Sequence, residues 1–310
     1  MIVNLIKLSR PRQWIKNFFV FAPLLFSRHM FDGWYVLKAF EAFVVFCFAS
    51  SSVYIVNDIL DAESDRAHPK KKYRPVASGE ISIKQAIVFL AIILLIIAAL
   101  LYIQRPEVTG IIILYITANL LYSLYIKSIV LLDVFFISFG FMVRVLGGAF
   151  AIGVSLSSWM VLCTIFISLF LAISKRRAEL SQSTADGSSP ENIHKQRRVL
   201  KDYSVEFADE LNTIAAAGTI ISYALYTVSD RTVQIFGTGK LIYTTPFVIY
   251  GIFRYMYLIH KKNLGESPST IVIKDIPIMI NVLLWFLSCI VIIYRLEIPL
   301  ISPLIRVFFP

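Results

Sequence analysis

Charged residues are scarce in this chain. They make up 16% of its 310 residues, against 57% for hydrophobic residues, whereas a typical soluble domain carries about 25% charged residues. The mean hydropathy of +0.73 agrees with this composition. The shortage of charge excludes an ordinary soluble domain and predicts a polytopic membrane protein.

The signatures of several enzyme classes are also missing. The sequence contains no Walker loop, no G-x-G-x-x-G, no H-E-x-x-H and no Ser-His-Asp pattern, which argues against an ATP-driven pump, a nicotinamide enzyme and a serine hydrolase. The three cysteines, Cys47, Cys163 and Cys289, lie in apolar runs without metal-ligand spacing, so we expect structural roles for them. The net charge of +10 belongs to the loops of a membrane protein, and we expect no nucleic-acid partner.

About nine apolar runs are long enough to cross a bilayer. The basic residues near the N-terminus precede a run that lacks a small-residue cleavage site, so we expect this run to remain as the first span. The runs predict an all-α bundle in which residues 1–310 form a single transmembrane domain. The expected spans are approximately residues 13–30, 35–60, 81–103, 108–126, 131–152, 157–174, 207–228, 240–259 and 276–294.

The distribution of Lys and Arg predicts the orientation. A cytoplasmic N-terminus places most of them on the cytoplasmic side, in agreement with the positive-inside rule. The polar stretches 60–80 and 175–206 then become cytoplasmic loops, and an odd number of spans leaves the C-terminus outside. We therefore expect the polar side chains to meet at a cytoplasmic mouth of the bundle, in the cell (inner) membrane.

Residues 57–79, NDILDAESDRAHPKKKYRPVASG, place acids directly before bases. If the preceding helix continues, the three spaced aspartates share one face. Bases follow at once, Lys70 and Arg74 among them, and such a pair of clusters suits a metal-bound, multiply phosphorylated ligand. The alternative is a solvated loop that only anchors the topology. The candidate oxygen ligands for Mg²⁺ are Asn57, Asp58, Asp61 and Asp65.

A second group of polar residues lies around the fifth expected span. Arg144 falls inside this span, and a guanidinium within a membrane usually faces the bundle interior and pairs with an anion. We expect it to contact a substrate phosphate or, alternatively, to form an internal salt bridge with Asp133. Tyr122 and Lys127 come before the span at its cytoplasmic end. Lys127 could equally be an ordinary lysine that reaches the membrane surface.

Further candidates lie in the later polar stretches. Lys175 and Arg176 begin a basic cluster with Tyr203 beyond it, and arginine recognises phosphate through two parallel hydrogen bonds. Cytoplasmic loops are, however, commonly this basic without binding a ligand. Glu266 lies in a short loop with Asp275, where acids could hold hydroxyls or a metal ion, or cap a helix.

Several strings, in this order, resemble one family. NDILDAESD looks like the NDxxDxxxD signature of the UbiA superfamily of intramembrane prenyltransferases. RPRQWIKN, HPKKKYRPVASG, YSLYIKSIVLLDV, GFMVRVLGGAF and KRRAEL are similar to its decaprenyl-phosphate phosphoribosyltransferase branch. The resemblance implies a nine-helix bundle with a Mg²⁺-dependent site that faces the cytoplasm. SKRRAEL is a departure, because many members carry a second aspartate-rich motif there; bases at this place suit a donor with an extra phosphate.

The resemblance implies an enzyme that moves 5-phosphoribose from phosphoribosyl pyrophosphate to a polyprenyl phosphate. The reaction would release pyrophosphate, invert the sugar carbon and supply pentose precursors for the cell envelope. The partners would be these substrates and the bilayer, and the chain could form a homo-oligomer. On this hypothesis Asp58, Asp61 and Arg144 are catalytic. The expected substrate contacts are Lys16, Lys70, Arg74, Tyr122, Lys127, Lys175, Arg176, Tyr203 and Glu266.

Two other functions fit parts of the sequence. An aromatic prenyltransferase would use a prenyl diphosphate and a quinone precursor at the same acidic motif. A transporter of a phosphorylated metabolite would account for an arginine inside the membrane and for a weak symmetry between the two halves. Such a transporter would move its substrate without releasing pyrophosphate.

Overall fold

The computed structural model describes residues 2–66, 71–185, 198–262, 271 and 274–295. Helices and short connections account for these residues, and no strand occurs among them, which confirms the predicted all-α class. The α-helices are α1 (Ile2–Ser9), α2 (Ala22–Leu25), α3 (Gly33–Leu60), α4 (Ala62–Arg66), α5 (Ile83–Tyr102), α6 (Pro106–Leu124), α7 (Leu132–Ile152), α8 (Ser158–Ala185), α10 (Val205–Val228), α11 (Asp230–Phe236), α12 (Thr245–Lys262) and α14 (Ile276–Tyr294). The 3₁₀ helices are η1 (Pro11–Phe21), η2 (Lys71–Tyr73), η3 (Ile126–Ser128), η4 (Arg198–Asp202) and η5 (Lys240–Thr244).

Seven helices in the described part of the chain are long and apolar enough to cross a membrane, namely α3, α5, α6, α7, α8, α10 and α14. They coincide with seven of the predicted spans. The first predicted span instead forms η1 followed by α2, and α12 carries Arg254, Lys261 and Lys262 within its 18 residues. The multi-pass character is confirmed, and the count of nine stays a prediction.

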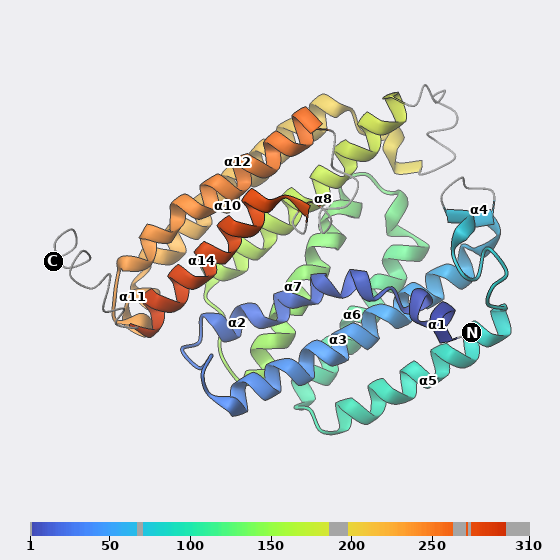
Figure 1. Ribbon diagram of the computed structural model, residues 1–310, viewed down its shortest axis with the longest axis horizontal. Coiled ribbons are helices and arrows are strands. Elements are labelled where there is room, and N and C mark those ends of the chain that lie inside the picture. The colour runs from blue at the N-terminus through green and yellow to red at the C-terminus, as the bar shows by residue number, and fades with distance from the viewer. Residues whose placement is uncertain (1, 67–70, 186–197, 263–270, 272–273, 296–310) are drawn as a thin grey trace.

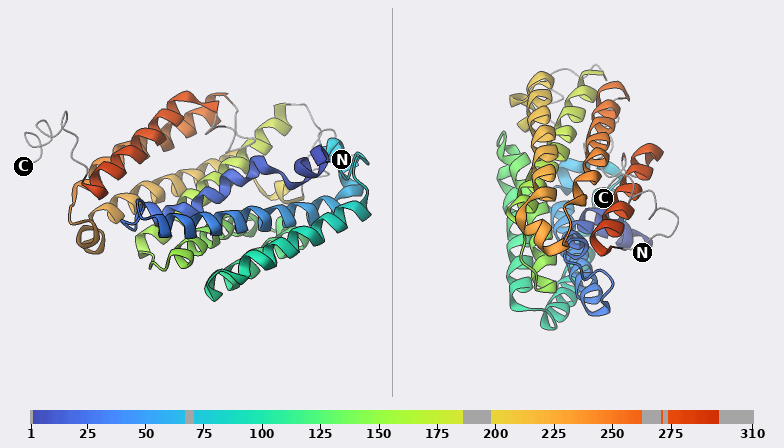
Figure 2. Two further views of the ribbon diagram at one scale, coloured as in Figure 1. Left: turned by 60° about the horizontal axis from the view of Figure 1, so that its bottom comes forward. Right: turned by 90° about the vertical axis from the view of Figure 1, so that its left-hand side faces the viewer.

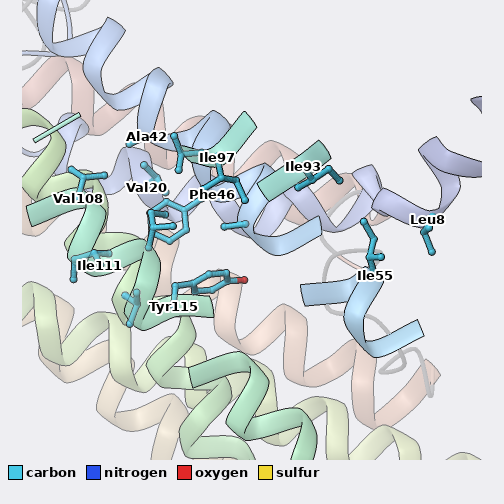
Figure 3. Packing of buried hydrophobic residues seen from close by; sticks show 14 of the residues in the cluster. Leu8, Val20, Ala42, Phe46, Ile55, Ile93, Ile97, Val108, Ile111 and Tyr115 are labelled. Atoms are coloured by element: carbon cyan, nitrogen blue, oxygen red, sulfur yellow. The ribbon is translucent and has the colours of Figure 1, made fainter. Parts of the chain in front are cut away.

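Helix α7 lies between two groups of helices (Figure 1). On one side it packs against η1, α3 and α6, and on the other against α8, which in turn packs along α10. One buried apolar cluster joins α3, α5 and α6 with Val143 of α7, and a second joins α8, α10 and α12 with Val134 of α7. In the first cluster the rings of Phe46 and Tyr115 pack edge to face, 5.4 Å apart (Figure 3). Helix α7 therefore belongs to both cores.

The close approach of α7 to its neighbours depends on two adjacent glycines. A Cβ at Gly148 would collide with the Val20 carbonyl of η1, and one at Gly147 would collide with a phenylalanine ring of α3. Because glycine has no side chain, the two backbones can come together here. This contact brings Asn17 of η1 within reach of Arg144 on α7.

The polar stretches gather at one end of the bundle. The C-terminal end of α3, α4 and η2 lie there together with α1, the end of α8 and η4 (Figures 1 and 2). The stretches 60–80 and 175–206 are less irregular than predicted, since α4 and η2 form in the first and the last turns of α8 in the second. Helix α8 continues through KRRAEL because these residues favour helix and no Gly or Pro interrupts them.

Asp275 caps the N-terminus of α14. Its Oδ1 accepts a hydrogen bond from the backbone N–H of Ile278 at 3.1 Å, and its Oδ2 lies 2.9 Å from the guanidinium of Arg254. Of the roles that the sequence left open for this acid, the capping role is the one observed.

Candidate functional site

The acidic stretch folds back on itself at the end of α3. The helix ends at Leu60, Asp61 has a non-helical backbone, and α4 begins at the next residue. Arg74, which follows η2, bridges the two buried acids: its guanidinium lies 2.5 Å from Oδ2 of Asp65 and 3.4 Å from Oδ1 of Asp58. Two of the three aspartates therefore converge on one arginine.

The third aspartate lies against a different cation. Oδ1 of Asp61 is 3.4 Å from Nζ of Lys127 in η3, and both side chains are partly exposed. The single face of three aspartates that a continuous helix would produce is not formed, because α3 breaks at Asp61. Lys127, predicted from the sequence as a substrate contact, thus lies beside the acidic stretch.

Arg10 belongs to this site and was missed by the sequence analysis. Its guanidinium forms an ion pair with Oδ1 of Asp58 and lies over the Tyr54 ring, 5.1 Å from the ring centre. The RPRQWIKN string indicated a basic segment, but Arg10 and Asp58 are 48 positions apart, so the contact could not be predicted from the sequence. A pair of this sequence separation is set by the packing of η1 on α3.

Oxygen ligands for a metal ion are present here. Oδ2 of Asp58 is buried and has no hydrogen-bond partner among the described residues, and Asp65 supplies a second buried carboxylate. In the described ranges no three His, Cys, Asp or Glu side chains already form a group that could hold an ion; two arginines contact the acids instead. The donor set, with an unsatisfied carboxylate oxygen, fits the preference of Mg²⁺ for oxygen.

Arg144 is buried in the bundle interior, as predicted, but it does not pair with Asp133. Its Nε donates to Oδ1 of Asn17, one terminal nitrogen donates to the Gly140 carbonyl and the other to the hydroxyl of Tyr115, each at 2.7 Å. The guanidinium also lies over the Tyr115 ring, 4.7 Å from its centre. No carboxylate within the described residues neutralises this charge, so the alternative of an internal salt bridge with Asp133 is wrong.

Lys16 adds a second cation without an acid beside it. It lies on η1 within electrostatic reach of both Arg144 and Arg10. It forms no hydrogen bond or ion pair with any residue that the structure describes. A region of positive charge therefore extends from Asp58 into the bundle, and an anionic group of a ligand is the natural partner for it.

Asp133 anchors a separate buried network at the same end of the bundle. Its Oδ2 accepts from Nε of Arg176 at 2.6 Å, and its Oδ1 accepts from the hydroxyl of Tyr203 at 2.9 Å. Arg176 also donates to Glu179 at 2.6 Å and to the hydroxyl of Tyr122 at 3.4 Å. Burial and the Asp133 carboxylate raise the pKa of Tyr203, so this phenol stays neutral and can donate.

The remaining predicted contacts are only partly placed. Nζ of Lys175 lies 3.8 Å from Oε1 of Glu179, on the outside of the same network. Lys70 and Glu266 lie outside the described residues. The structure thus brings Asp58, Asp65 and Arg74 together, and it brings Arg176, Tyr122 and Tyr203 together around Asp133 as a second group.

Comparison with known proteins decides the family. Residues 18–186 match the model of the UbiA prenyltransferase family. This chain belongs to the UbiA family. It is 33% identical over 296 residues to the decaprenyl-phosphate phosphoribosyltransferase of Mycolicibacterium smegmatis, covering 92% of this chain and 91% of that protein. It is 32% identical over 297 residues to the enzyme of the same name from Corynebacterium glutamicum, covering 94% of this chain and 87% of that one.

The fold comparison agrees with this assignment. A UbiA homologue from Archaeoglobus fulgidus, solved with GPP and Mg²⁺, has a TM-score of 0.68 and 18% identity, covering 94% of this chain and 99% of that chain. At this identity the likeness concerns the fold alone. It confirms the predicted UbiA-like bundle.

In this UbiA chain the charged candidates were apparent from the sequence, but the neutral residues that orient them were not. Asn17 and Tyr115 hold Arg144, and neither stood out because Asn and Tyr within apolar runs are common. RPRQWIKN does contain Asn17 next to Lys16. A polar residue inside the predicted span 13–30 was the signal available for it.

Proposed function

We propose that this chain transfers 5-phosphoribose from phosphoribosyl pyrophosphate to a polyprenyl phosphate. The observation that carries the proposal is the similarity, over 92% and 94% of the chain, to two relatives named for this kind of transfer. The uncompensated charge of Arg144 and Lys16 supports it, because both substrates are phosphates and charge-assisted hydrogen bonds to phosphate are strong.

Mg²⁺ is the cofactor that we propose. The structural neighbour from Archaeoglobus fulgidus was solved with this ion, and the unsatisfied oxygen of Asp58 supports a similar role here. Bound at this place, Mg²⁺ would offset the negative charge that develops on the departing pyrophosphate. The residues that would hold it are Asn57, Asp58, Asp61 and Asp65.

The cations would position the phosphates of the two substrates. Arg74 and Lys127 lie beside the acids and would contact the pyrophosphate, while Lys16 and Arg144 would contact a phosphate deeper in the bundle. Arg176 already forms ion pairs with Asp133 and Glu179. To bind a substrate phosphate, it would have to exchange one of these carboxylates for the phosphate. The further contacts in this proposal are Lys70, Lys175, Tyr122, Tyr203 and Glu266.

The chemistry needs little beyond this positioning. An oxygen of the lipid phosphate attacks C1 of the ribose while the bond from C1 to the pyrophosphate oxygen breaks, so the configuration at C1 inverts. The attacking phosphate is already ionised at neutral pH, and no general base is required. Holding the attacking lipid phosphate in line with the departing pyrophosphate accelerates the reaction further.

The orientation and the path of the lipid complete the proposal. The polar end of the bundle faces the cytoplasm, with the N-terminus inside and the C-terminus outside the cell (inner) membrane. The polyprenyl tail leaves the site sideways between apolar helices, because a long isoprenoid chain is most stable in hydrocarbon. The product would feed pentose into the cell envelope.

Incubation of the purified protein with phosphoribosyl pyrophosphate labelled in the sugar, polyprenyl phosphate and Mg²⁺ tests the proposal. We expect a labelled lipid whose mass equals that of polyprenyl phosphate plus phosphoribose, and we expect Asp58→Asn to abolish it. Turnover of a prenyl diphosphate with a quinone precursor, without labelled lipid, would instead identify an aromatic prenyltransferase. Uptake of phosphorylated metabolite into sealed vesicles without pyrophosphate release would identify a transporter.

A further inference from the structure

The ion pair between Arg10 and Asp58 joins a partly exposed cation to a buried acid. The Asp58 side chain is 1% exposed, whereas the Arg10 side chain keeps 26% exposure. Arg74 keeps the same fraction and lies 3.4 Å from the same oxygen, Oδ1. Two guanidinium groups thus occupy one oxygen of Asp58, while the other, Oδ2, has no partner among the described residues.

The backbone of Arg10 is held in an unusual conformation. It is left-handed, with φ 50° and ψ 56°, which is unfavourable by roughly 1–2 kcal/mol for a residue with a Cβ. The hydroxyl of Ser51 on α3 fixes the segment, since it donates to the Ser9 carbonyl at 2.8 Å and accepts from the indole N–H of Trp14 at 3.0 Å. A strained conformation that the surroundings hold in place points to a functional role for the side chain.

A cation at Asp58 would compete with this arginine. Mg²⁺ at the free Oδ2 of Asp58 and the Arg10 guanidinium at Oδ1 would compete for the charge of one carboxylate, so binding of the free ion opposes the ion pair. An ion that arrives together with a diphosphate changes this balance. The displaced guanidinium then has an anion beside it, and its fork matches two phosphate oxygens.

We propose that Arg10 is a specificity-determining residue that makes this site select the Mg²⁺–diphosphate complex over free Mg²⁺. The Arg10 side chain neutralises Asp58 until the complex binds, and then donates to the diphosphate. Metal and diphosphate binding are thereby coupled, each strengthening the other. This inference rests on the proposed function, because it requires Mg²⁺ to bind at Asp58.

Calorimetric titration of the full chain in detergent, with Mg²⁺ alone and with Mg²⁺–pyrophosphate, tests the coupling. We expect Arg10→Gln to bind Mg²⁺ alone about tenfold more tightly and Mg²⁺–pyrophosphate about 10- to 100-fold more weakly, because a competitor for the ion and a charged donor to the anion are both lost. Arg12→Gln is the matched control, since Arg12 is exposed and near in sequence. It should leave both affinities within about twofold of the original protein.

The sign of the two shifts decides the outcome. Weaker binding of both ligands by Arg10→Gln would show a merely structural role and overturn the inference, as would unchanged affinities. If Arg10→Gln does not fold, Arg10→Lys is the second variant, because lysine keeps the charge but lacks the forked donor geometry of the guanidinium. Weaker binding of Mg²⁺–pyrophosphate together with unweakened binding of Mg²⁺ then supports the inference, and loss of both overturns it. If the original protein binds Mg²⁺–pyrophosphate no better than Asp58→Asn does, the metal site of the proposed function fails, and the inference with it.

Discussion

The ion pair between Arg176 and Asp133 allows a direct test of how burial sets the importance of a charge pair. Both side chains are 0% exposed, and Nε of the arginine lies 2.6 Å from Oδ2 of the acid. The next residue, Arg177, makes a pair of equal length with Asp209, but these side chains keep 10% and 32% exposure. The two pairs share their chemistry, their length and helix α8. They differ in burial and in their further contacts, since Arg176 also pairs with Glu179 and Oδ1 of Asp209 also lies 3.1 Å from Nε2 of His260.

Asp133→Asn leaves the Arg176 guanidinium buried, with Glu179 as its one remaining charged partner among the described residues. Removing one member of a buried pair costs about 3–5 kcal/mol, and because Glu179 remains we expect about 3 kcal/mol. Asp209→Asn affects a pair in contact with solvent and should cost at most about 1 kcal/mol. At about 2–4 °C per kcal/mol, the melting temperature falls by roughly 6–12 °C for Asp133→Asn and by less than about 4 °C for Asp209→Asn.

Thermal unfolding in one detergent at one scan rate measures both variants. In the double variant Asp133→Asn/Arg176→Gln the uncompensated charge is gone. Its melting temperature should therefore fall by less than the sum of the decreases in the two single variants. Equal losses from Asp133→Asn and Asp209→Asn would refute the reasoning, because burial would then make no difference. Strict additivity in the double variant would refute the claim that the unpaired cation is the cause.

Three more predictions follow from individual contacts. Arg144→Lys loses the fixed fork that holds three hydrogen bonds and should lower the initial rate of labelled-lipid formation about 10- to 100-fold, with the melting temperature measured as a check on folding. Gly148→Ala, which introduces a Cβ against a backbone carbonyl, should destabilise by about 1–3 kcal/mol, whereas Gly110→Ala, with open space around it, should be neutral or stabilising in the same unfolding assay. Lys127→Ala removes an exposed pair with Asp61, so stability should change by less than about 1 kcal/mol while turnover falls; unchanged turnover would contradict its assignment as a substrate contact.

The spans were predictable because they depend on local composition. Runs of about 20 apolar residues form helices in a bilayer whatever surrounds them, since only internal hydrogen bonding satisfies their backbone. Two segments differ from this expectation. The first run, predicted over residues 13–30, forms the 3₁₀ helix η1 followed by α2. The predicted loop after residue 174 continues as helix because nothing in KRRAEL stops it.

Many charged residues of the candidate site were predictable from the sequence, but Arg10 and the contacts within the site were not. The acidic motif, Arg74, Lys127 and Arg144 could be picked out because charges near or within apolar runs are costly and conspicuous. The partner of each charge depends on which helices pack together. Asp133 was considered as an alternative partner of Arg144, which lies on the same helix, and instead pairs with Arg176 from α8. Asp61 was expected to share a helical face with Asp58 and Asp65 if the helix continued, but α3 ends at Leu60, one residue before Asp61.

The sequence by itself determined the class of the protein, most of its spans, its family and the residue types available for phosphate and metal binding. These properties follow from composition and from short strings, which do not depend on distant contacts. Only the tertiary structure decided which charges neutralise one another and which remain open to a ligand. Arg10 reaches Asp58 across 48 residues, and two glycines on α7 let η1 approach so that Asn17 meets Arg144. Such pairings are set by the packing of helices, because a side chain at a given position can face only the neighbour that the fold places there.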